Sequence, residues 1–453
     1  MRRGFLGSLA ALCLGAGAAL AQQLPAPRPL ESSFSSPSLP QEKMAASPHW
    51  TMESGSSTTA PYLLCGPRPY AGAGPACDHP SVSCNEEEIP ATSIWARAEY
   101  LLWWIKDAPL SVPLVTTSSP GSLGVLGNSD TAVLFGDSEI EYRAFSGARF
   151  TLGLWADSYQ TCGFEASGFF LEKHPVTFAA ASTTTGVPLL ARPFVNPLTG
   201  AESSLLVSAP DQFTGSVAVR SASSLYGWEA NLLGNLTRRG GVSVDLLAGF
   251  RYVHFQEDLT IGQSSTLLPG GTTGFEGQVI VPPATIGVFD SFVTRNDFYG
   301  GQLGARAEYL RGRVFVQLQG KVALGSTHEV AFINGASSLA VPGNPTVTVP
   351  GGLLAVSSNS GRSVHDDFSV VPELAINIGY ELSRHLRVYA GYTFLYWTDM
   401  ARPGDLLNRT VNPTLVPTSQ AFSIANGPAQ PQSSFQRADF WAQGANLGLE
   451  LRY

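Results

Sequence analysis

Histidines beside carboxylates are the residues of this 453-residue chain that could do acid–base chemistry. His365 is followed directly by Asp366 and Asp367, and His254 stands in another segment. Such side chains can serve as a general base and its orienting group for a nucleophile. No nucleophile–base pair can be identified beside them, and the chain contains no HExxH, no Walker-type glycine loop and no Gly-x-Ser-x-Gly. The sequence therefore predicts no catalytic residues and no enzyme.

The N-terminus has the three parts of a secretory signal peptide. Arg2 and Arg3 form a basic region, an apolar stretch follows, and Ala19-Leu20-Ala21 is a small-x-small cleavage site. An uncleaved membrane anchor is the alternative, but the apolar stretch is short and ends at the cleavage site. We therefore expect residues 1–21 to be a signal peptide that exports the chain.

Four cysteines remain once the signal peptide is removed. Cys65, Cys77 and Cys84 cluster near the N-terminus, and Cys162 lies far from them. With His79 the cluster could in principle bind a metal, but its spacing fits no zinc pattern. An exported chain permits disulfides, and four cysteines allow three connectivities. The sequence predicts at least one disulfide among these four residues, no metal site and no cofactor.

The composition is unusual for a soluble protein. Charged residues make up 14% of the chain, where about 25% is usual. The mean hydropathy is +0.07, and after the N-terminus no apolar run is long enough for a transmembrane helix. Loss of the two signal arginines takes the net charge from −8 to −10, which argues against a nucleic-acid partner.

The composition and the hydropathy pattern of the chain change at residue 93. Residues 22–92 are rich in Pro, Ser, Gly and Ala, which predicts a flexible periplasmic segment. Beyond them, apolar and polar residues alternate with a period of two, as in a strand with one apolar face. Ten segments have this pattern: 94–104, 146–155, 163–172, 224–236, 242–252, 299–309, 314–324, 368–380, 386–396 and 441–453.

The links between these segments are alternately short and long. The long ones are rich in Gly, Ser, Thr and Pro. Short periplasmic turns and long external loops alternate in this way in outer-membrane barrels, whereas a soluble β-sandwich has no reason to place every long loop at one end. The sequence therefore predicts an all-β fold, with residues 93–453 forming an antiparallel transmembrane β-barrel of about ten strands, or alternatively twelve. The short links are 156–161, 237–241, 310–313 and 381–385, and the long ones are 105–144, 173–222, 258–296, 326–366 and 398–438.

If the apolar faces meet lipid, the polar faces line the lumen. On that parity seven basic and seven acidic residues point inward. Buried charges must be paired, and a barrel of about ten strands is narrow enough for side chains to fill it. We therefore expect a mostly filled lumen. The predicted lumen-lining residues are Arg97, Glu99, Arg149, Glu165, Glu229, Asp245, Arg251, Arg306, Glu308, Lys321, Glu373, Arg387, Glu450 and Arg452.

Aromatic residues near the strand ends predict two belts at the headgroup levels. The external belt would hold Trp104, Trp228, Tyr252, Tyr299 and Tyr396, and the periplasmic belt Trp155, Tyr309, Tyr380 and Tyr453.

The last strand is similar to the signal by which outer-membrane barrels are recognised for assembly. Asn446 is polar, Gly448 follows two residues on, and Leu451 and Tyr453 are large and apolar. The alternative is that this is one more amphipathic strand. The expected partners are therefore the barrel-assembly machinery and outer-membrane lipid.

Several segments, in order along the chain, resemble the putative beta-barrel porin-7 family of bacterial outer-membrane proteins. The resemblance runs from about residue 93 to the C-terminus and implies an outer-membrane barrel of a Gram-negative-type bacterium, without a defined substrate. The segments are Trp95–Trp104, Ala108–Thr117, Ala132–Gly136, Arg149–Trp155, Asp245–Tyr252, Asn296–Gly304 and Lys321–Gly325.

Two functions remain open at this point. A porin for passive diffusion of small solutes needs a continuous water path through the lumen. A structural or surface-interaction barrel needs that path to be blocked, by the charge network or by an infolded loop.

Overall fold

The computed structural model describes residues 93–423, 427–433 and 435–453. Its helical segments are two 3₁₀ turns, η1 (Pro403–Leu406) and η2 (Pro413–Leu415). No helix in this part of the chain is long and apolar enough to cross a membrane. The predicted signal peptide and the predicted periplasmic segment lie outside the described residues.

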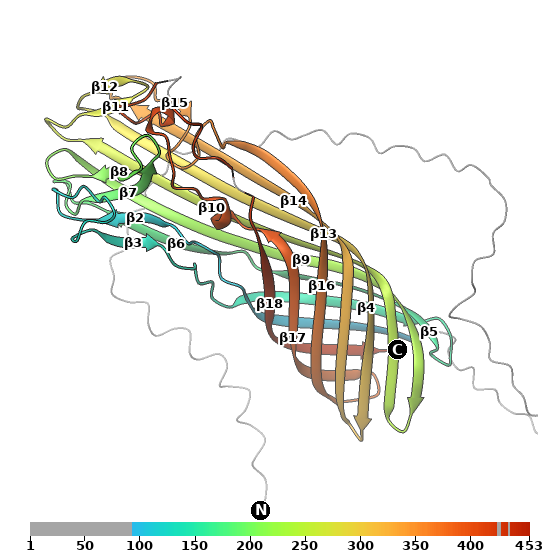
Figure 1. Ribbon diagram of the computed structural model, residues 1–453. Coiled ribbons are helices and arrows are strands. Elements are labelled where there is room, and N and C mark those ends of the chain that lie inside the picture. The colour runs from blue at the N-terminus through green and yellow to red at the C-terminus, as the bar shows by residue number, and fades with distance from the viewer. Residues whose placement is uncertain (1–92, 424–426, 434) are drawn as a thin grey trace, which may run out of the picture. The chain divides into compact units, whose positions relative to one another are not determined.

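Ten antiparallel strands form a closed ring (Figure 1). β1 completes the ring because it pairs with β4 on one side and with β18 on the other, so that Ala98 lies opposite both Phe150 and Leu449. Each strand has two hydrogen-bonded neighbours, which removes the unpaired edges that lipid cannot solvate. The predicted ten-stranded barrel is thereby confirmed. In ring order the strands are β1 (Ser93–Ile105), β4 (Phe145–Trp155), β5 (Cys162–Leu171), β9 (Phe213–Arg239), β10 (Val242–Leu267), β13 (Thr285–Arg311), β14 (Val314–Ala340), β16 (Gly361–Glu381), β17 (Leu386–Ala401) and β18 (Arg437–Arg452).

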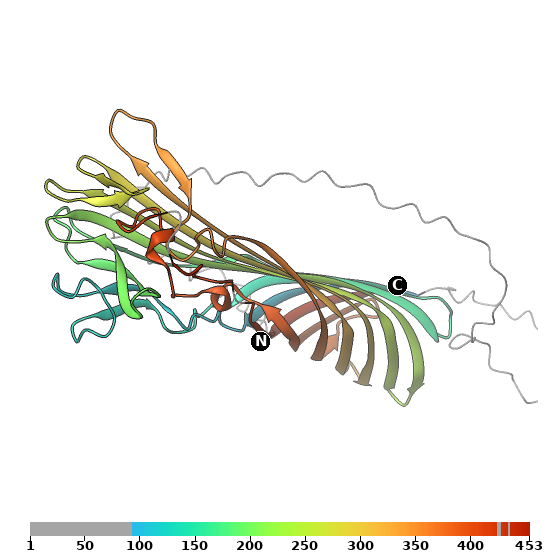
Figure 2. The same cartoon turned by 45° about the horizontal axis from the view of Figure 1, so that its top comes forward.

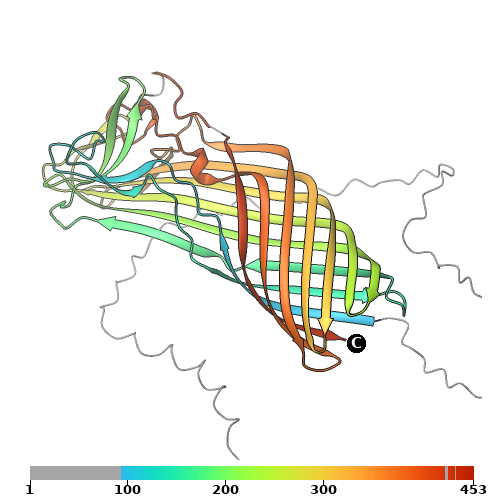
Figure 3. The ribbon, with the colours of Figure 1, turned by 60° about the horizontal axis from the view of Figure 1, so that its bottom comes forward.

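The short links lie at the same end of the barrel as the start of β1 and the end of β18 (Figure 3). The β9–β10 turn consists of Gly240 and Gly241, whose φ angles are 62° and 82°. Glycine adopts these left-handed conformations without a Cβ clash, which a tight two-residue hairpin requires. Short turns are periplasmic in outer-membrane barrels, so we call this end periplasmic and the opposite end external.

The barrel strands are much longer than the sequence pattern predicted. β9, β10, β13 and β14 span 26 or 27 residues each, whereas about 9–11 residues cross the bilayer. Much of the expected external links 258–296 and 326–366 is therefore paired strand, which the sequence pattern did not predict.

The reason is a switch of the apolar face within a continuous strand. In the membrane part of β10, the apolar Leu246 and Phe250 point outward and are exposed. Beyond Tyr252 the apolar residues point inward instead, and Val253 and Ile261 among them are fully buried. Where a strand passes from lipid into water, its outer face must become polar. Its apolar residues then point inward, where they can pack against a core.

The external ends of the strands and the segments that connect them gather at one end of the ribbon (Figure 2). Their buried apolar side chains form a core there. Ion pairs also lie inside this core: Arg402 contacts Glu257 at 2.8 Å, and Arg192 contacts Asp290 at 2.7 Å. The external part is thus a folded β-structure continuous with the barrel wall. Its additional strands are β2 (Pro113–Thr117), β3 (Ala132–Gly136), β7 (Leu190–Asn196) and β8 (Ala201–Ser208) in one sheet, the hairpin β11 (Thr273–Phe275) and β12 (Gln278–Ile280), β6 (His174–Ala181) beside β9, and β15 (Val347–Pro350) beside β14.

One residue of the predicted aromatic belts faces the wrong way. Trp228, Tyr252 and Tyr299 do lie opposite one another on three adjacent strands. Trp155, however, is 6% exposed and packs inside the barrel against Trp95, with ring centroids 5.6 Å apart. It shares the inward parity of Arg149 on β4, so its assignment to the periplasmic belt was wrong.

Candidate functional site: the charged interior of the barrel

All fourteen predicted lumen residues form ion pairs with one another inside the ring. Several pairs join strands that are not neighbours in the sheet, so these side chains meet across the interior. Most of the side chains are buried. The ion pairs fall into three groups along the barrel.

The central group surrounds two carboxylates, Glu229 on β9 and Glu373 on β16. Nη2 of Arg251 lies 2.6 Å from Glu229 Oε2 and 2.5 Å from Glu373 Oε2. Nζ of Lys321 contacts the same two carboxylates at 2.7 and 3.1 Å. Arg149 approaches Glu373 at 3.9 Å and extends the group toward Glu99, 3.8 Å away. Each cation thus bridges two anions, which offsets the cost of burying any one of them.

A second group lies beside it on β5, β10 and β13. Nη1 of Arg306 is 2.8 Å from Glu165, and its Nε is 3.5 Å from Asp245. Trp95 Nε1 also donates to Glu165, at 3.2 Å. Here again one cation is held between two carboxylates from different strands.

The third group lies near the periplasmic end. Arg97 contacts Glu450 at 2.5 Å, and Arg387 contacts Glu308 at 3.0 Å. Arg452 pairs with Glu450 and lies 3.8 Å from Glu308. This group joins β1 to β17 and β18, and through Glu308 to β13.

Neutral polar residues complete the network, and the charge pattern did not reveal them. Gln302 donates to Asn231 at 2.5 Å, and Asn377 donates to Gln317 at 3.3 Å. Asn446, predicted as part of an assembly signal, accepts from Trp103 Nε1 at 2.8 Å. All five residues share the inward parity of the charged ones, which is the signal that could have identified them.

An apolar layer covers the charged groups on their external side. On each of four strands, the inward apolar residue that follows the last member of these three ion-pair groups is almost fully buried. Above these lie large aromatic rings, and Arg149 lies under two of them, 5.3 Å from Trp103 and 5.7 Å from Phe169. The four first residues of this layer are Leu101, Val253, Ala323 and Val371, and the fully buried rings are Trp103, Phe255, Phe298, Trp397 and Phe440.

Two cavities in the described part of the barrel bear on whether it is open. The one among the central charges has a volume of about 30 Å³, enough for roughly one or two water molecules. The other opens at the periplasmic end and has a volume of about 280 Å³. The space within the barrel is therefore divided between a packed centre and a periplasmic vestibule.

The two histidines considered for catalysis lie on opposite faces of the wall, His254 on the outward face of β10 and His365 on the inward face of β16. His254 Nδ1 is 2.7 Å from Asp297, and Asp366 contacts His328 of the neighbouring strand at 2.7 Å and not His365. His365 packs against the Phe435 ring instead. In the part of the chain that the structure describes, no three His, Cys, Asp or Glu residues are grouped so as to hold a metal.

Cys162 is the first residue of β5 and is disulfide-bonded. Cys65, Cys77 and Cys84 lie outside the described residues, so the connectivity stays a prediction. In the adjacent turn, burial opposes ionisation of Asp157. The backbone N–H groups of Cys162 and Thr161 outweigh that effect, and the pKa of Asp157 is lowered.

A closed ring with a lipid-compatible outer face and a charged interior defines an outer-membrane β-barrel protein. The chain belongs to the putative beta-barrel porin-7 family, whose family model matches residues 95–453. No curated protein matches it.

Two solved outer-membrane structures are similar to the chain at low identity. The outer membrane protease OmpT from Escherichia coli has 8% identity and a TM-score of 0.36, covering 80% of this chain and 97% of that one. A FadL homologue from Pseudomonas aeruginosa has 6% identity and a TM-score of 0.21, covering 80% and 90%. At these scores neither similarity bears on function.

Proposed function

We propose that this protein is a closed outer-membrane barrel that anchors a folded β-structure at the cell surface. The observation that carries the proposal is the stack of two closely packed layers, ion pairs below and aromatic rings above. A passive porin needs a continuous aqueous path, and the cavity among the central charges is only about 30 Å³. The proposal includes export through the N-terminal signal and the absence of catalysis.

The anchoring role is supported by how the external part is built. β10 and β13 are paired without interruption from Val242 opposite Tyr309 to Thr266 opposite Thr285. The external half of this hairpin therefore stands on the membrane half as one continuous element. Such a structure is suited to present a fixed surface to something outside the cell.

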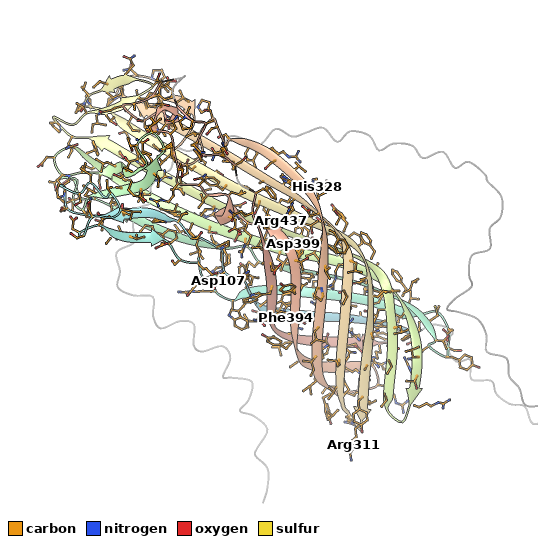
Figure 4. The ribbon with its side chains drawn as sticks, in the orientation of Figure 1. Asp107, Arg311, His328, Phe394, Asp399 and Arg437 are labelled. Atoms are coloured by element: carbon orange, nitrogen blue, oxygen red, sulfur yellow. The ribbon has the colours of Figure 1, made fainter. Side chains whose placement is uncertain are left out.

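Conductance of purified protein in a planar bilayer tests the closed lumen. We expect no stepwise current from the wild-type protein. Trp103→Ala removes a fully buried indole from the aromatic layer, whereas Phe394→Ala removes a phenyl ring from the outer face of β17 (Figure 4). We expect Trp103→Ala to conduct more than Phe394→Ala. Steady wild-type conductance that passes small solutes would favour the porin function instead.

A further inference from the structure

The vestibule at the periplasmic end is rich in arginine. It has a volume of about 280 Å³, and Asp245 and Glu308 are the acidic residues that line it. We call this cavity the arginine vestibule. Its six arginines are Arg97, Arg238, Arg239, Arg306, Arg387 and Arg452.

Two of these arginines are not neutralised by the interior network. Arg238 lies 3.9 Å from Asp245, a carboxylate already shared with Arg306. Arg239 is exposed and forms no ion pair with the residues that the structure describes. Asp157, in a nearby turn, is engaged by the backbone N–H groups of Thr161 and Cys162. The mouth of the arginine vestibule therefore has an excess of positive charge.

A run of three acids precedes, in the sequence, the strand that begins at this mouth. Ser93, the first residue of β1, lines the arginine vestibule, and Glu86-Glu87-Glu88 precedes it in the sequence. Glu88 is five residues from Ser93 and Glu86 is seven, so the extended chain reaches at most about 18 Å and about 25 Å respectively. The carboxylates are thus attached to the rim by a short tether.

The disulfide provides a second attachment. Cys162 is disulfide-bonded, and every other cysteine of the chain precedes Glu86. Gln160, two residues from Cys162, also lines the arginine vestibule. The predicted partners Cys65, Cys77 and Cys84 all precede the acidic run in the sequence, so the disulfide and β1 provide attachment points on either side of it.

We propose that the carboxylates of Glu86–Glu88 bind in the arginine vestibule as an intramolecular ligand. The double attachment gives them a high effective concentration there. Carboxylates are the groups that the planar guanidinium binds best, by charge-assisted and bidentate hydrogen bonds. A free anion would have to displace a ligand that is covalently tethered.

Proteolysis of the folded, full-length protein with a glutamate-specific protease tests this binding. We expect cleavage after Glu86–Glu88 to be slower than cleavage after Glu42 and Glu53 of the same chain. Arg238→Gln with Arg239→Gln should speed cleavage after Glu86–Glu88 roughly tenfold, because two charge pairs are lost. Arg311→Gln with Arg313→Gln makes the same charge change in the next turn, outside the vestibule lining, and should leave that rate unchanged.

Heat-modifiable mobility on a gel establishes that both double variants are folded. A salt titration of the wild-type protein supplies a second measurement, and protection should weaken between about 0.05 and 0.5 M salt as screening increases. Wild-type cleavage after Glu86–Glu88 as fast as after Glu42 and Glu53 overturns the proposal. So does an equal effect of the two double variants, which would indicate net charge, or protection that persists without Arg238 and Arg239, which would indicate the disulfide alone.

Discussion

Arg306 on β13 and Glu165 on β5 lie three strands apart around the ring, yet Nη1 of the arginine is 2.8 Å from Oε2 of the glutamate. A contact of this kind is made only when the sheet has closed and the opposite walls approach. The ion pairs across the interior therefore form only in the closed barrel. We expect the two residues of each pair to be coupled energetically.

This coupling can be measured with a double-mutant cycle on Glu165 and Arg306. Each single change to alanine leaves a buried charge without its partner, and we expect each to cost about 3–5 kcal/mol of unfolding free energy. The double variant should cost clearly less than the sum of the two. Unfolding in lipid vesicles, followed by tryptophan fluorescence in urea, gives the values; additive costs would show that the pair does not interact.

Glu373 should be among the most sensitive of the interior residues. Its carboxylate contacts Arg251 and Lys321 and lies near Arg149. Glu373→Gln should lower the unfolding free energy by about 3–5 kcal/mol, because three buried cations lose an anion. Glu202→Gln breaks a more exposed pair with Arg409 and should cost about 1 kcal/mol or less. Equal costs for the two variants would contradict a dry interior.

The switch of the apolar face predicts opposite results at adjacent residues of β10. Ile261 is fully buried and points inward, whereas Thr260 points outward above the membrane. Ile261→Lys should destabilise the protein by about 3 kcal/mol or more, and Thr260→Lys should stay within about 0.5 kcal/mol. In the membrane part the parity reverses, and Leu246→Lys on the outer face should cost about 2–4 kcal/mol. Thermal unfolding of the three variants distinguishes the faces, and the reverse order at 260 and 261 would contradict the switch.

The C-terminus is expected to be needed for assembly. Leu451 lies opposite Ala96 on β1 and opposite Leu386 on β17, so it helps to close the ring. Deletion of residues 451–453 should leave export intact but yield protein that stays unfolded in the periplasm. Heat-modifiable mobility of outer-membrane fractions is the measurement, with Tyr453→Phe as a control that keeps an aromatic end. Normal levels of folded, truncated protein in the membrane would exclude this role.

Thiol labelling tests the disulfide prediction in the protein itself. Unreduced, denatured protein should leave Cys162 unmodified together with one of Cys65, Cys77 and Cys84, and reduction should expose both. Mass spectrometry of the labelled peptides identifies the partner. Modification of all four cysteines without reduction would refute the prediction.

The sequence alone determined the membrane part of this protein. The period-two pattern identified the segments that became the ten ring strands, and the parity of Arg251 and Glu373 placed both on the inward face, because side chains alternate strictly along a strand. The same parity would have placed Trp155 inside, had it been applied to that residue.

Only the tertiary structure decided where the strands end and which charges meet. Beyond Tyr252 the apolar residues of β10 change parity because the surroundings change from lipid to water. A period-two pattern with one apolar face therefore ends at that residue, although the strand continues. The pairing of Arg306 with Glu165 depends on the curvature and closure of the whole ring. Parity gives the face of a residue, but the distance across the barrel is set by every strand between the two.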